Sequence, residues 1–311
     1  MEINKNRFFA ILLSIVMLSA LLFMEVSGET KVDKDRPCSL TLTFAPEDLK
    51  ASGVKFEAYK VASVTDSYGF SVEPEFENQE ITKLLVNPDS QSYSLIASTL
   101  SGIIASDSSL KPYSAAITNS SGTAVFSDLK VGLYLIIGEV YKGEKAYYTP
   151  QNFMVSLPER SSDGLWNYDI FAETKWEKRL RDDILNLKVL KVWGDSAENL
   201  HANDNVTVEL YENGKLYSTQ ILNKNNNWSY EWKNLNIGAS FTVKEKDIEG
   251  YISSVERKED CFVITNTPKE AIKKPAPIPQ TGLLWWPVPM LISVGILLIF
   301  VGAYLKRKGE K

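Results

Sequence analysis

The sequence has little of the chemistry on which most enzymes and metal sites depend. It contains one histidine, His201, and two cysteines among 311 residues. This scarcity excludes most zinc sites and the catalytic arrangements that depend on histidine. Serine, histidine, aspartate or paired carboxylates do not converge at motif-like spacing either. We therefore expect a protein that is not an enzyme and that carries no metal and no cofactor.

An excess of positive charge is also missing. The chain has 34 basic and 39 acidic residues, so its formal net charge is −5. A protein that binds nucleic acid needs a basic face to meet the phosphates. We therefore expect no nucleic-acid partner.

Long apolar runs occur only near the two ends of the chain. The first follows Lys5 and Arg7 and leads into small residues, which is typical of a secretory signal peptide covering residues 1–28. The second predicts a transmembrane helix at 283–305, followed by a basic cytoplasmic tail at 306–311. The sequence thus indicates an exported protein.

The region between these runs is rich in Val, Tyr, Phe, Trp and Thr in short alternating stretches. Residues 39–44 and 205–211 alternate with period two, as half-buried strands do, and Asn213-Gly214 is a hairpin signal. This pattern predicts an all-β fold of the immunoglobulin-like sandwich type. Helical spacing in 93–104 and a shorter helical turn at 79–86 predict an insertion that covers the first sheet.

The chain also repeats its own pattern in two halves. Two blocks occur in the same order in each half: Val54-Lys-Phe-Glu-Ala-Tyr59 with Val206-Thr-Val-Glu-Leu-Tyr211, and Phe126-Ser-Asp-Leu-Lys-Val-Gly132 with Trp232-Lys-Asn-Leu-Asn-Ile-Gly238. We therefore predict two tandem sandwiches, at 37–175 and 184–267. A charged connector at 177–183 would join them, and 268–282 would be an extended linker.

A five-residue motif precedes the second apolar run: Ile278-Pro279-Gln280-Thr281-Gly282. With the apolar span and basic tail behind it, the motif resembles a sortase sorting signal of the LPXTG type of Gram-positive bacteria, with Ile in the first position. The resemblance implies cleavage between Thr281 and Gly282 by the cysteine of a sortase. The product would be covalently attached to the peptidoglycan of the cell wall or to a pilus, and would span the membrane only before cleavage.

The second half resembles the Cna B-type domain of Gram-positive surface proteins. The resemblance rests on Lys188-Val-Leu-Lys-Val-Trp193, Phe241-Thr-Val-Lys-Glu245 and Ile264-Thr-Asn-Thr267. Such domains form an internal isopeptide bond, which would join Lys191 to Asn266 with the help of Glu245. Burial would favour the neutral amine and the neutral acid that this reaction needs. The sequence departs from the family at 200–204, where an Arg-Pro pair is usual, and we expect this loop to leave the crosslink residues undisturbed.

The first half resembles the N-terminal domain of sortase-assembled pilins. Those pilins often carry a motif of the form Trp-x-x-x-Val-x-Val-Tyr-Pro-Lys, whose lysine receives the sorting-signal threonine of the next subunit. Aligned on Trp166, the motif places Ile170 at the first Val and Lys175 at the Lys, although the intervening residues differ. Lys175 is thus the expected site of intermolecular linkage, with Lys178 as a nearby rival.

Two questions stay open at the level of sequence. The first half has no lysine in its candidate first strand, and either Gly138 or Glu139 could correspond to Glu245, so an internal bond there is not the favoured interpretation. Cys38 and Cys261 would be exported, where a disulfide is permitted, but two free thiols are an equal alternative.

The combined features indicate a structural subunit of a sortase-assembled pilus, with the backbone role favoured. Its partners would be sortase, other pilin subunits and peptidoglycan. The alternatives are a monomeric wall-anchored adhesin that binds a host or glycan ligand, and a minor tip or basal pilin, which would not need Lys175.

Overall fold

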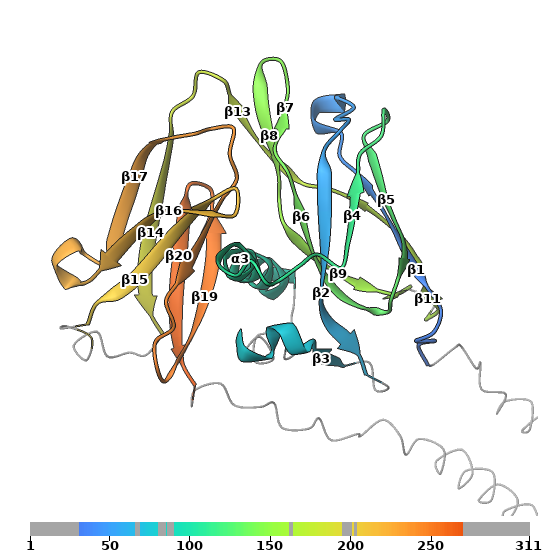
Figure 1. The fold of residues 1–311 in the computed structure, drawn as a ribbon, viewed down its shortest axis with the longest axis horizontal. Coiled ribbons are helices and arrows are strands. Elements are labelled where there is room, and N and C mark those ends of the chain that lie inside the picture. Colours follow the sequence, from blue (N-terminus) through green and yellow to red (C-terminus); the bar gives the residue numbers. More distant parts are fainter. Residues whose placement is uncertain are drawn as a thin grey trace, which may run out of the picture. The chain divides into compact units, whose positions relative to one another are not determined.

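The computed structural model describes residues 31–65, 69–79, 85, 90–161, 164–194, 201 and 204–269. These residues form an all-β protein with two tandem immunoglobulin-like sandwiches (Figure 1), which confirms the predicted fold class. Within this described part, no helix is long and apolar enough to cross a membrane. The predicted signal peptide, the sorting motif and the apolar run 283–305 lie outside the described residues.

The first sandwich is built from two main sheets, in the strand orders β12-β1-β5 and β3-β2-β6-β9, with β4 also paired to β2. The strands are β1 (Cys38–Thr43), β2 (Lys55–Val64), β3 (Phe70–Val72), β4 (Ser114–Ile117), β5 (Thr123–Leu129), β6 (Gly132–Gly138), β9 (Phe153–Leu157) and β12 (Asp169–Glu173). In β1 the alternation predicted from sequence buries Leu40 and Leu42 fully. These side chains join Phe56, Tyr134 and Ile136 of the facing sheet in the core.

The helix α3 (Ser90–Ser106) covers the other face of the sheet that contains β2 and β6. Ile96, Leu100 and Ile103 recur at helical spacing and are all buried, as the sequence predicted. They pack in one cluster with Val61 and Leu133 from that sheet. Because the sheet is covered on both faces, β6 is a nearly continuous apolar run rather than an alternating one. The shorter turn predicted at 79–86 lies almost wholly outside the described residues; a 3-10 helix, η2 (Pro74–Gln79), ends where that turn would begin.

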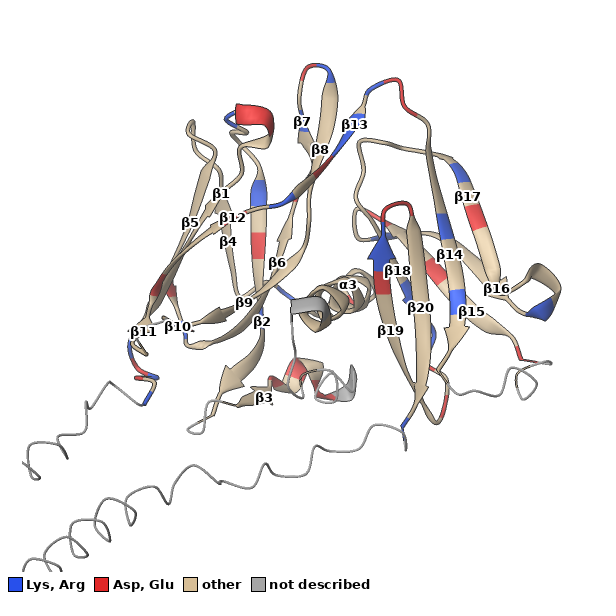
Figure 2. Ribbon diagram, turned by 180° about the vertical axis from the view of Figure 1, so that it is seen from behind, with Lys and Arg blue, Asp and Glu red and all other residues tan. Residues whose placement is uncertain are grey.

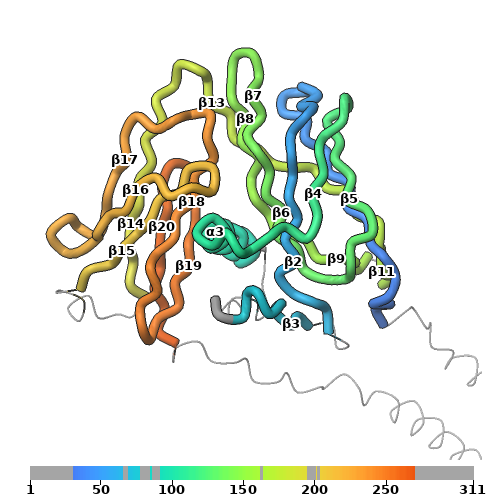
Figure 3. The backbone as a smooth tube through the Cα atoms, viewed as in Figure 1, coloured from blue at the N-terminus to red at the C-terminus, as the bar shows by residue number. Residues whose placement is uncertain are grey.

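The predicted charged connector is instead a strand for most of its length. The strand β13 (Trp176–Leu180) pairs with β8 (Ala146–Pro150), which in turn pairs with β7 (Tyr141–Lys142). Trp176 packs against the core of the first sandwich, which explains why the segment is ordered despite its charges. The chain then passes from β13 into β14 (Leu185–Trp193) of the second sandwich (Figure 3). A small pair, β10 (Glu159–Arg160) and β11 (Trp166–Asn167), completes the described strands of the first half.

The second sandwich consists of a sheet in the order β17-β14-β20-β19 and a sheet in the order β16-β15-β18. The remaining strands are β15 (Val206–Glu212), β16 (Lys215–Leu222), β17 (Ser229–Leu235), β18 (Phe241–Glu245), β19 (Tyr251–Lys258) and β20 (Cys261–Pro268). The predicted hairpin joins β15 to β16, with positive φ values of 48° at Asn213 and 74° at Gly214. The core between the sheets includes Leu187, Val208 and Ile264.

The helix α3 contacts both sandwiches (Figure 1). On the side of the second sandwich, the backbone N–H of Val255 in β19 donates to Thr99 Oγ1 over 2.8 Å. Thr99 in turn donates to the carbonyl of Leu95, so its hydroxyl links the two sandwiches through a buried hydrogen bond. The helical insertion therefore covers a sheet of the first sandwich and supports the edge of the second.

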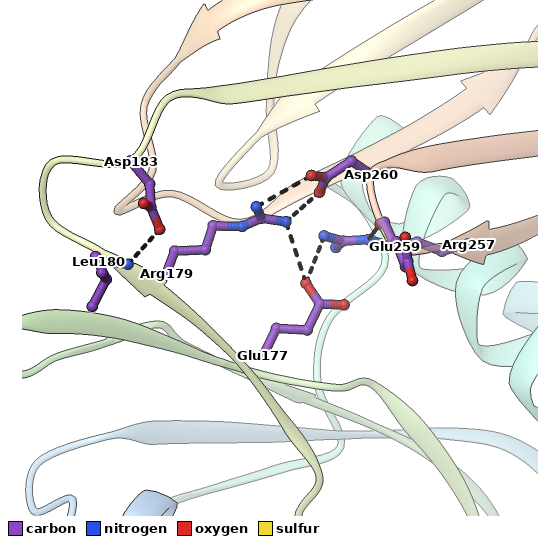
Figure 4. A network of polar contacts seen from close by, with 7 residues as sticks. All are labelled: Glu177, Arg179, Leu180, Asp183, Arg257, Glu259 and Asp260. Carbon is purple, nitrogen blue, oxygen red and sulfur yellow. Dashed lines mark hydrogen bonds and ion pairs between the residues drawn. The ribbon is translucent and has the colours of Figure 1, made fainter.

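A cluster of ion pairs forms a second contact between the sandwiches. Figure 2 shows charged residues along β13 and at the end of β19, and Figure 4 shows how they meet. Arg179 of β13 makes a two-pronged contact with Asp260, and Arg257 Nη2 lies 3.0 Å from Glu177 Oε2. Each such pair, being partly exposed, contributes only about 0–1 kcal/mol. The cluster therefore adds little to stability.

Candidate crosslinking and subunit-linkage sites

The second sandwich carries three polar side chains at positions that alternation assigns to the core. In β14 the inward residues are Leu187, Val189 and then Lys191; each of the other two strands follows the same pattern of two apolar residues and one polar residue. The polar residues are Glu245 at the end of β18 and Asn266 near the end of β20. Their exposed fractions are 3% for Lys191, 2% for Glu245 and 0% for Asn266. The structure thus brings together the three residues that the sequence proposed for an isopeptide site.

The distances within this group are short. Lys191 Nζ lies 3.6 Å from Glu245 Oε2, and Asn266 Nδ2 lies 2.6 Å from Glu245 Oε1. Lys191 Nζ also donates to the carbonyl of Val192 over 2.8 Å. Burial raises the pKa of Glu245 above its usual range, and the nearby Lys191 offsets this only in part. Burial therefore shifts Glu245 toward its protonated form in the folded domain.

The contact between Glu245 and Asn266 fits an acid proton better than an amide proton. A separation of 2.6 Å is short for N–H···O but ordinary for O–H···O. Asn266 Oδ1 is buried and has no hydrogen-bond partner when Nδ2 faces the carboxyl group. A half-turn about the Cβ–Cγ bond exchanges the two amide atoms. Asn266 Oδ1 would then accept a hydrogen bond from the protonated carboxyl group of Glu245, and this hydrogen bond would polarise the Asn266 carbonyl.

The strand register shows what occupies the same positions in the first sandwich. In the second sandwich Val208 of β15 lies opposite Glu245, and in the first the matching Phe56 of β2 lies opposite Gly138. Gly138, rather than Glu139, therefore corresponds to Glu245. A Cβ on Gly138 would come within 2.4 Å of the Phe56 ring, so a larger side chain does not fit there.

The lysine position is replaced in the first sandwich as well. Leu40 pairs with Phe126 and Leu187 pairs with Trp232, and both strand pairs have a register shift just before this point. Four residues beyond Leu40 stands Phe44, the counterpart of Lys191, which packs edge-on against Phe56 with ring centroids 5.8 Å apart. Aromatic side chains thus take the place of the polar group in the first sandwich. The lysine and the glutamate that the crosslinking reaction needs are both missing at these positions.

Lys175 lies directly after β12, between this strand and β13, and its side chain is exposed. The preceding motif residues Trp166 and Ile170 are buried in the first core, so they anchor the strand that presents Lys175. The backbone is fixed at the same point, because the carbonyl of Lys175 accepts from Gln151 N over 2.8 Å. Among the described residues, no hydrogen bond or ion pair engages the Lys175 ammonium group.

The rival Lys178 is in a different situation. Its Nζ lies 2.8 and 2.9 Å from the two carboxylate oxygens of Glu47, which also accepts from the Tyr148 hydroxyl group. The hydrogen bond to Glu47 raises the pKa of Lys178 above its ordinary value. Lys178 therefore holds its proton more tightly and is the poorer candidate for a nucleophile.

One described residue of the loop that departs from the family pattern, His201, contacts Trp193, which neighbours Lys191; the distances within the crosslink group stay short beside it. His201 is buried and stacks on Trp193, with ring centroids 3.6 Å apart and an interplanar angle of 1°. Trp193 is also in contact with Lys191, whose Nζ lies 4.3 Å from the centre of the ring. The contact could not be predicted from the local sequence of 200–204, because it joins a loop residue to a strand residue.

The two cysteines are not bridged to each other. Cys38 is buried and Cys261 is partly exposed, and both are free thiols. Burial raises the pKa of Cys38 to about 11, so this thiol stays protonated. Within the described ranges, no group of three or more His, Cys, Asp or Glu side chains is placed to hold a metal ion.

Comparison with known proteins identifies the second sandwich. Residues 187–267 match the family model of the Cna protein B-type domain, so this segment is similar to that domain. The match includes Lys191, Glu245 and Asn266. It covers one domain and leaves the first sandwich unassigned. No curated protein matches the chain.

Solved structures of Gram-positive surface proteins show more distant similarity. A single B repeat unit of the collagen-binding surface protein of Staphylococcus aureus is 15% identical, with 75% of this chain and 98% of that chain covered and a TM-score of 0.26. The two-repeat form is 14% identical, with 79% and 57% covered and a TM-score of 0.26. The T6 backbone pilin of Streptococcus pyogenes is 14% identical, with 76% and 64% covered and a TM-score of 0.32. The chain thus spans less than two thirds of the last two, and TM-scores this low do not define a shared overall architecture.

Proposed function

We propose that this chain is a structural subunit of a covalent, sortase-assembled fibre on the surface of a Gram-positive cell, and that the second sandwich carries an internal isopeptide bond. The observation that carries the proposal is the buried group of Lys191, Glu245 and Asn266. Isolated polar groups in a core are costly, and a buried ion pair is often no better than an apolar replacement. A reaction that consumes the amine and the carboxamide gives this group a purpose.

The reaction follows from the positions of the three side chains. One proton moves from the Lys191 ammonium to the Glu245 carboxylate, which turns a buried ion pair into a neutral amine and a neutral acid. Nζ then attacks Cγ of Asn266 while the acid polarises the carbonyl oxygen. The Nζ–Cγ bond forms and the Cγ–Nδ2 bond breaks. One hydrogen of the attacking amine passes to Nδ2 by way of Glu245, so that Nδ2 leaves as ammonia. The fixed geometry supplies what a separate catalyst would otherwise provide.

The bond would act as a mechanical and thermodynamic restraint. It closes a loop of about 75 residues, for which the chain-entropy model of a crosslink gives about 4–5 kcal/mol. The sheet order places β14 and β20 next to each other in parallel, so the bond would join the first and last strands of the domain. A pull on the two ends of the domain would then load this bond rather than the strand hydrogen bonds.

Assembly into a fibre would use two further sites. A sortase would cleave the motif formed by residues 278–282 after Thr281, and the Thr281 carboxyl would pass to Lys175 of another subunit or to peptidoglycan. The exposed, unengaged side chain of Lys175 supports this role, whereas Lys178 is held by Glu47. On this account residues 1–28 direct export and 283–311 hold the chain in the membrane until cleavage.

An immunoblot of cell-wall extract boiled in detergent tests the fibre proposal. Covalent polymers of this chain should appear as a ladder of high-mass bands. A single band at the size of the processed monomer would favour the alternative of a monomeric, wall-anchored adhesin with a host or glycan ligand. A band of mixed composition that lacks repeats of this chain would indicate a minor tip or basal pilin.

A further inference from the structure

The Trp193 indole has an aromatic partner on one face and the Lys191 amine on the other. His201 stacks on the ring, with centroids 3.6 Å apart and an interplanar angle of 1°, and so covers the middle of one face. Lys191 Nζ lies 4.3 Å from the centre of the same ring. Two groups this close to one ring centre cannot share a face without colliding, so the amine and the imidazole lie on opposite sides.

His201 is itself held in place on several sides. Its Nδ1 lies 2.7 Å from Asp204 Oδ2, and its Nε2 lies 3.4 Å from the Tyr251 hydroxyl oxygen. Tyr251 also meets Trp193 edge-on, with ring centroids 5.2 Å apart, and Trp228 does the same at 5.6 Å. The side chain of His201 is 6% exposed. The stack is therefore a built feature of the domain.

The position of the indole matters to the chemistry of Lys191. The Lys191 side chain is fully shielded from solvent, and only an unprotonated amine can attack a carboxamide. Trp193 lies two residues after Lys191 on the same strand and forms part of this shield. Because Trp193 is only partly buried, loss of the ring stacked on its outer face would leave the indole free to tilt and let water reach the amine.

We propose that His201 is a positioning residue for crosslink formation: by stacking on Trp193 it holds the indole against Lys191 and keeps water from the amine. The proposal rests on the internal bond proposed above. It assigns a role to the loop at which this sequence departs from the Cna B-type pattern. It also explains why the single histidine of the chain is buried beside the crosslink group.

The test follows the reaction in time in the exported chain, residues 29–281. The chain is recovered unfolded in urea, where the three strands are apart, and is then diluted into buffer. Far-ultraviolet circular dichroism follows folding, while intact mass follows the loss of about 17 Da for each amide formed from amine and carboxamide. Wild type is compared with His201→Ala and with His201→Phe, which restores a flat ring but not the bond to Asp204. Tyr217→Ala is the matched control, because it removes an aromatic contact with Phe241 in the same domain away from Lys191.

We expect His201→Ala to reach the folded state and then lose ammonia between about tenfold and a hundredfold more slowly than wild type, the range that small misplacements of reacting groups cause. His201→Phe should recover most of the rate, and Tyr217→Ala should match wild type. An unchanged rate in folded His201→Ala overturns the proposal, as does a delay that only follows slower folding. If His201→Ala does not fold, a rate in folded His201→Phe that is about tenfold or more below that of wild type contradicts it, because the ring stack is then present without its effect. Wild type that keeps its full mass would instead refute the internal bond itself.

Discussion

Gly102 in α3 lies against the backbone of Val243 in β18 so closely that a Cβ at Gly102 would stand 2.1 Å from the Val243 carbonyl oxygen. Glycine inside a helix costs about 1 kcal/mol relative to alanine, so its presence here has a structural cause. The cause is the close approach of the helix to the second sandwich. The two sandwiches are therefore fitted to each other along α3.

Because of this contact, we expect Gly102→Ala to lower the stability of the protein, whereas most glycine-to-alanine changes inside helices raise it. If α3 did not dock on β18, alanine should stabilise the helix by about 1 kcal/mol. Because the new methyl group meets backbone atoms that cannot rotate away, we expect a loss of about 1–3 kcal/mol instead. Calorimetric unfolding of the exported chain measures the difference, with Ser94→Ala on the exposed side of the same helix as the control. A higher Tm in Gly102→Ala than in wild type would show that the docking does not form.

The buried carboxyl group of Glu245 should make an uncrosslinked variant sensitive to pH. In Lys191→Met the bond cannot form and Glu245 loses its nearby positive charge, so burial, the largest influence on its pKa, raises it with less opposition. A folded-state pKa above the unfolded value, about 4.3, means that the folded domain holds the proton more tightly. Stability is then complete below about pH 4 and is lost as the pH rises through the folded-state pKa.

We therefore expect the Tm of Lys191→Met to fall as the pH rises above about 4, and to fall more steeply than that of the double variant Lys191→Met/Glu245→Gln. Glutamine has the same shape and does not titrate, so the difference between the two slopes isolates the carboxyl group. Parallel slopes would mean that Glu245 is hydrated and ionised in the folded domain.

Polymerisation should depend on Lys175 and not on Lys178. Arginine keeps the positive charge but stays protonated, so it cannot act as the nucleophile. In cells that express the sortase, Lys175→Arg should abolish the high-mass ladder on an immunoblot, while monomer is still exported and anchored through Thr281. Lys178→Arg preserves an ion pair with Glu47 and should leave the ladder intact. The reverse pattern would keep the fibre proposal and move the linkage site to Lys178.

Much of this arrangement could be predicted from local sequence pattern. The repeated blocks predict two sandwiches, whereas the placement of Lys191 and Glu245 in a core came from the resemblance to the Cna B-type domain. The spacing of Ile96, Leu100 and Ile103 likewise predicts α3 and its buried face.

Contacts between distant segments could not be predicted in this way. The charged run that forms β13 looks like a linker because its strand pairing depends on β8 and on burial of Trp176. Only the pairing of Phe56 with Gly138 shows that the first sandwich has a glycine at the position that Glu245 occupies in the second. The stack of His201 on Trp193 joins a loop to a strand, and no local periodicity records it.

The most direct test of the central claim is the intact mass of the folded exported chain, residues 29–281, made without a sortase. One amide formed from Lys191 and Asn266 releases one ammonia, so the chain should weigh about 17 Da less than its sequence. Lys191→Ala, Glu245→Gln and Asn266→Ala should each restore the full mass, because they remove the nucleophile, the acid or the carboxamide. A deficit of two ammonias would show that the first sandwich also reacts. The full sequence mass in wild type would contradict the internal bond and with it the purpose assigned to the buried group.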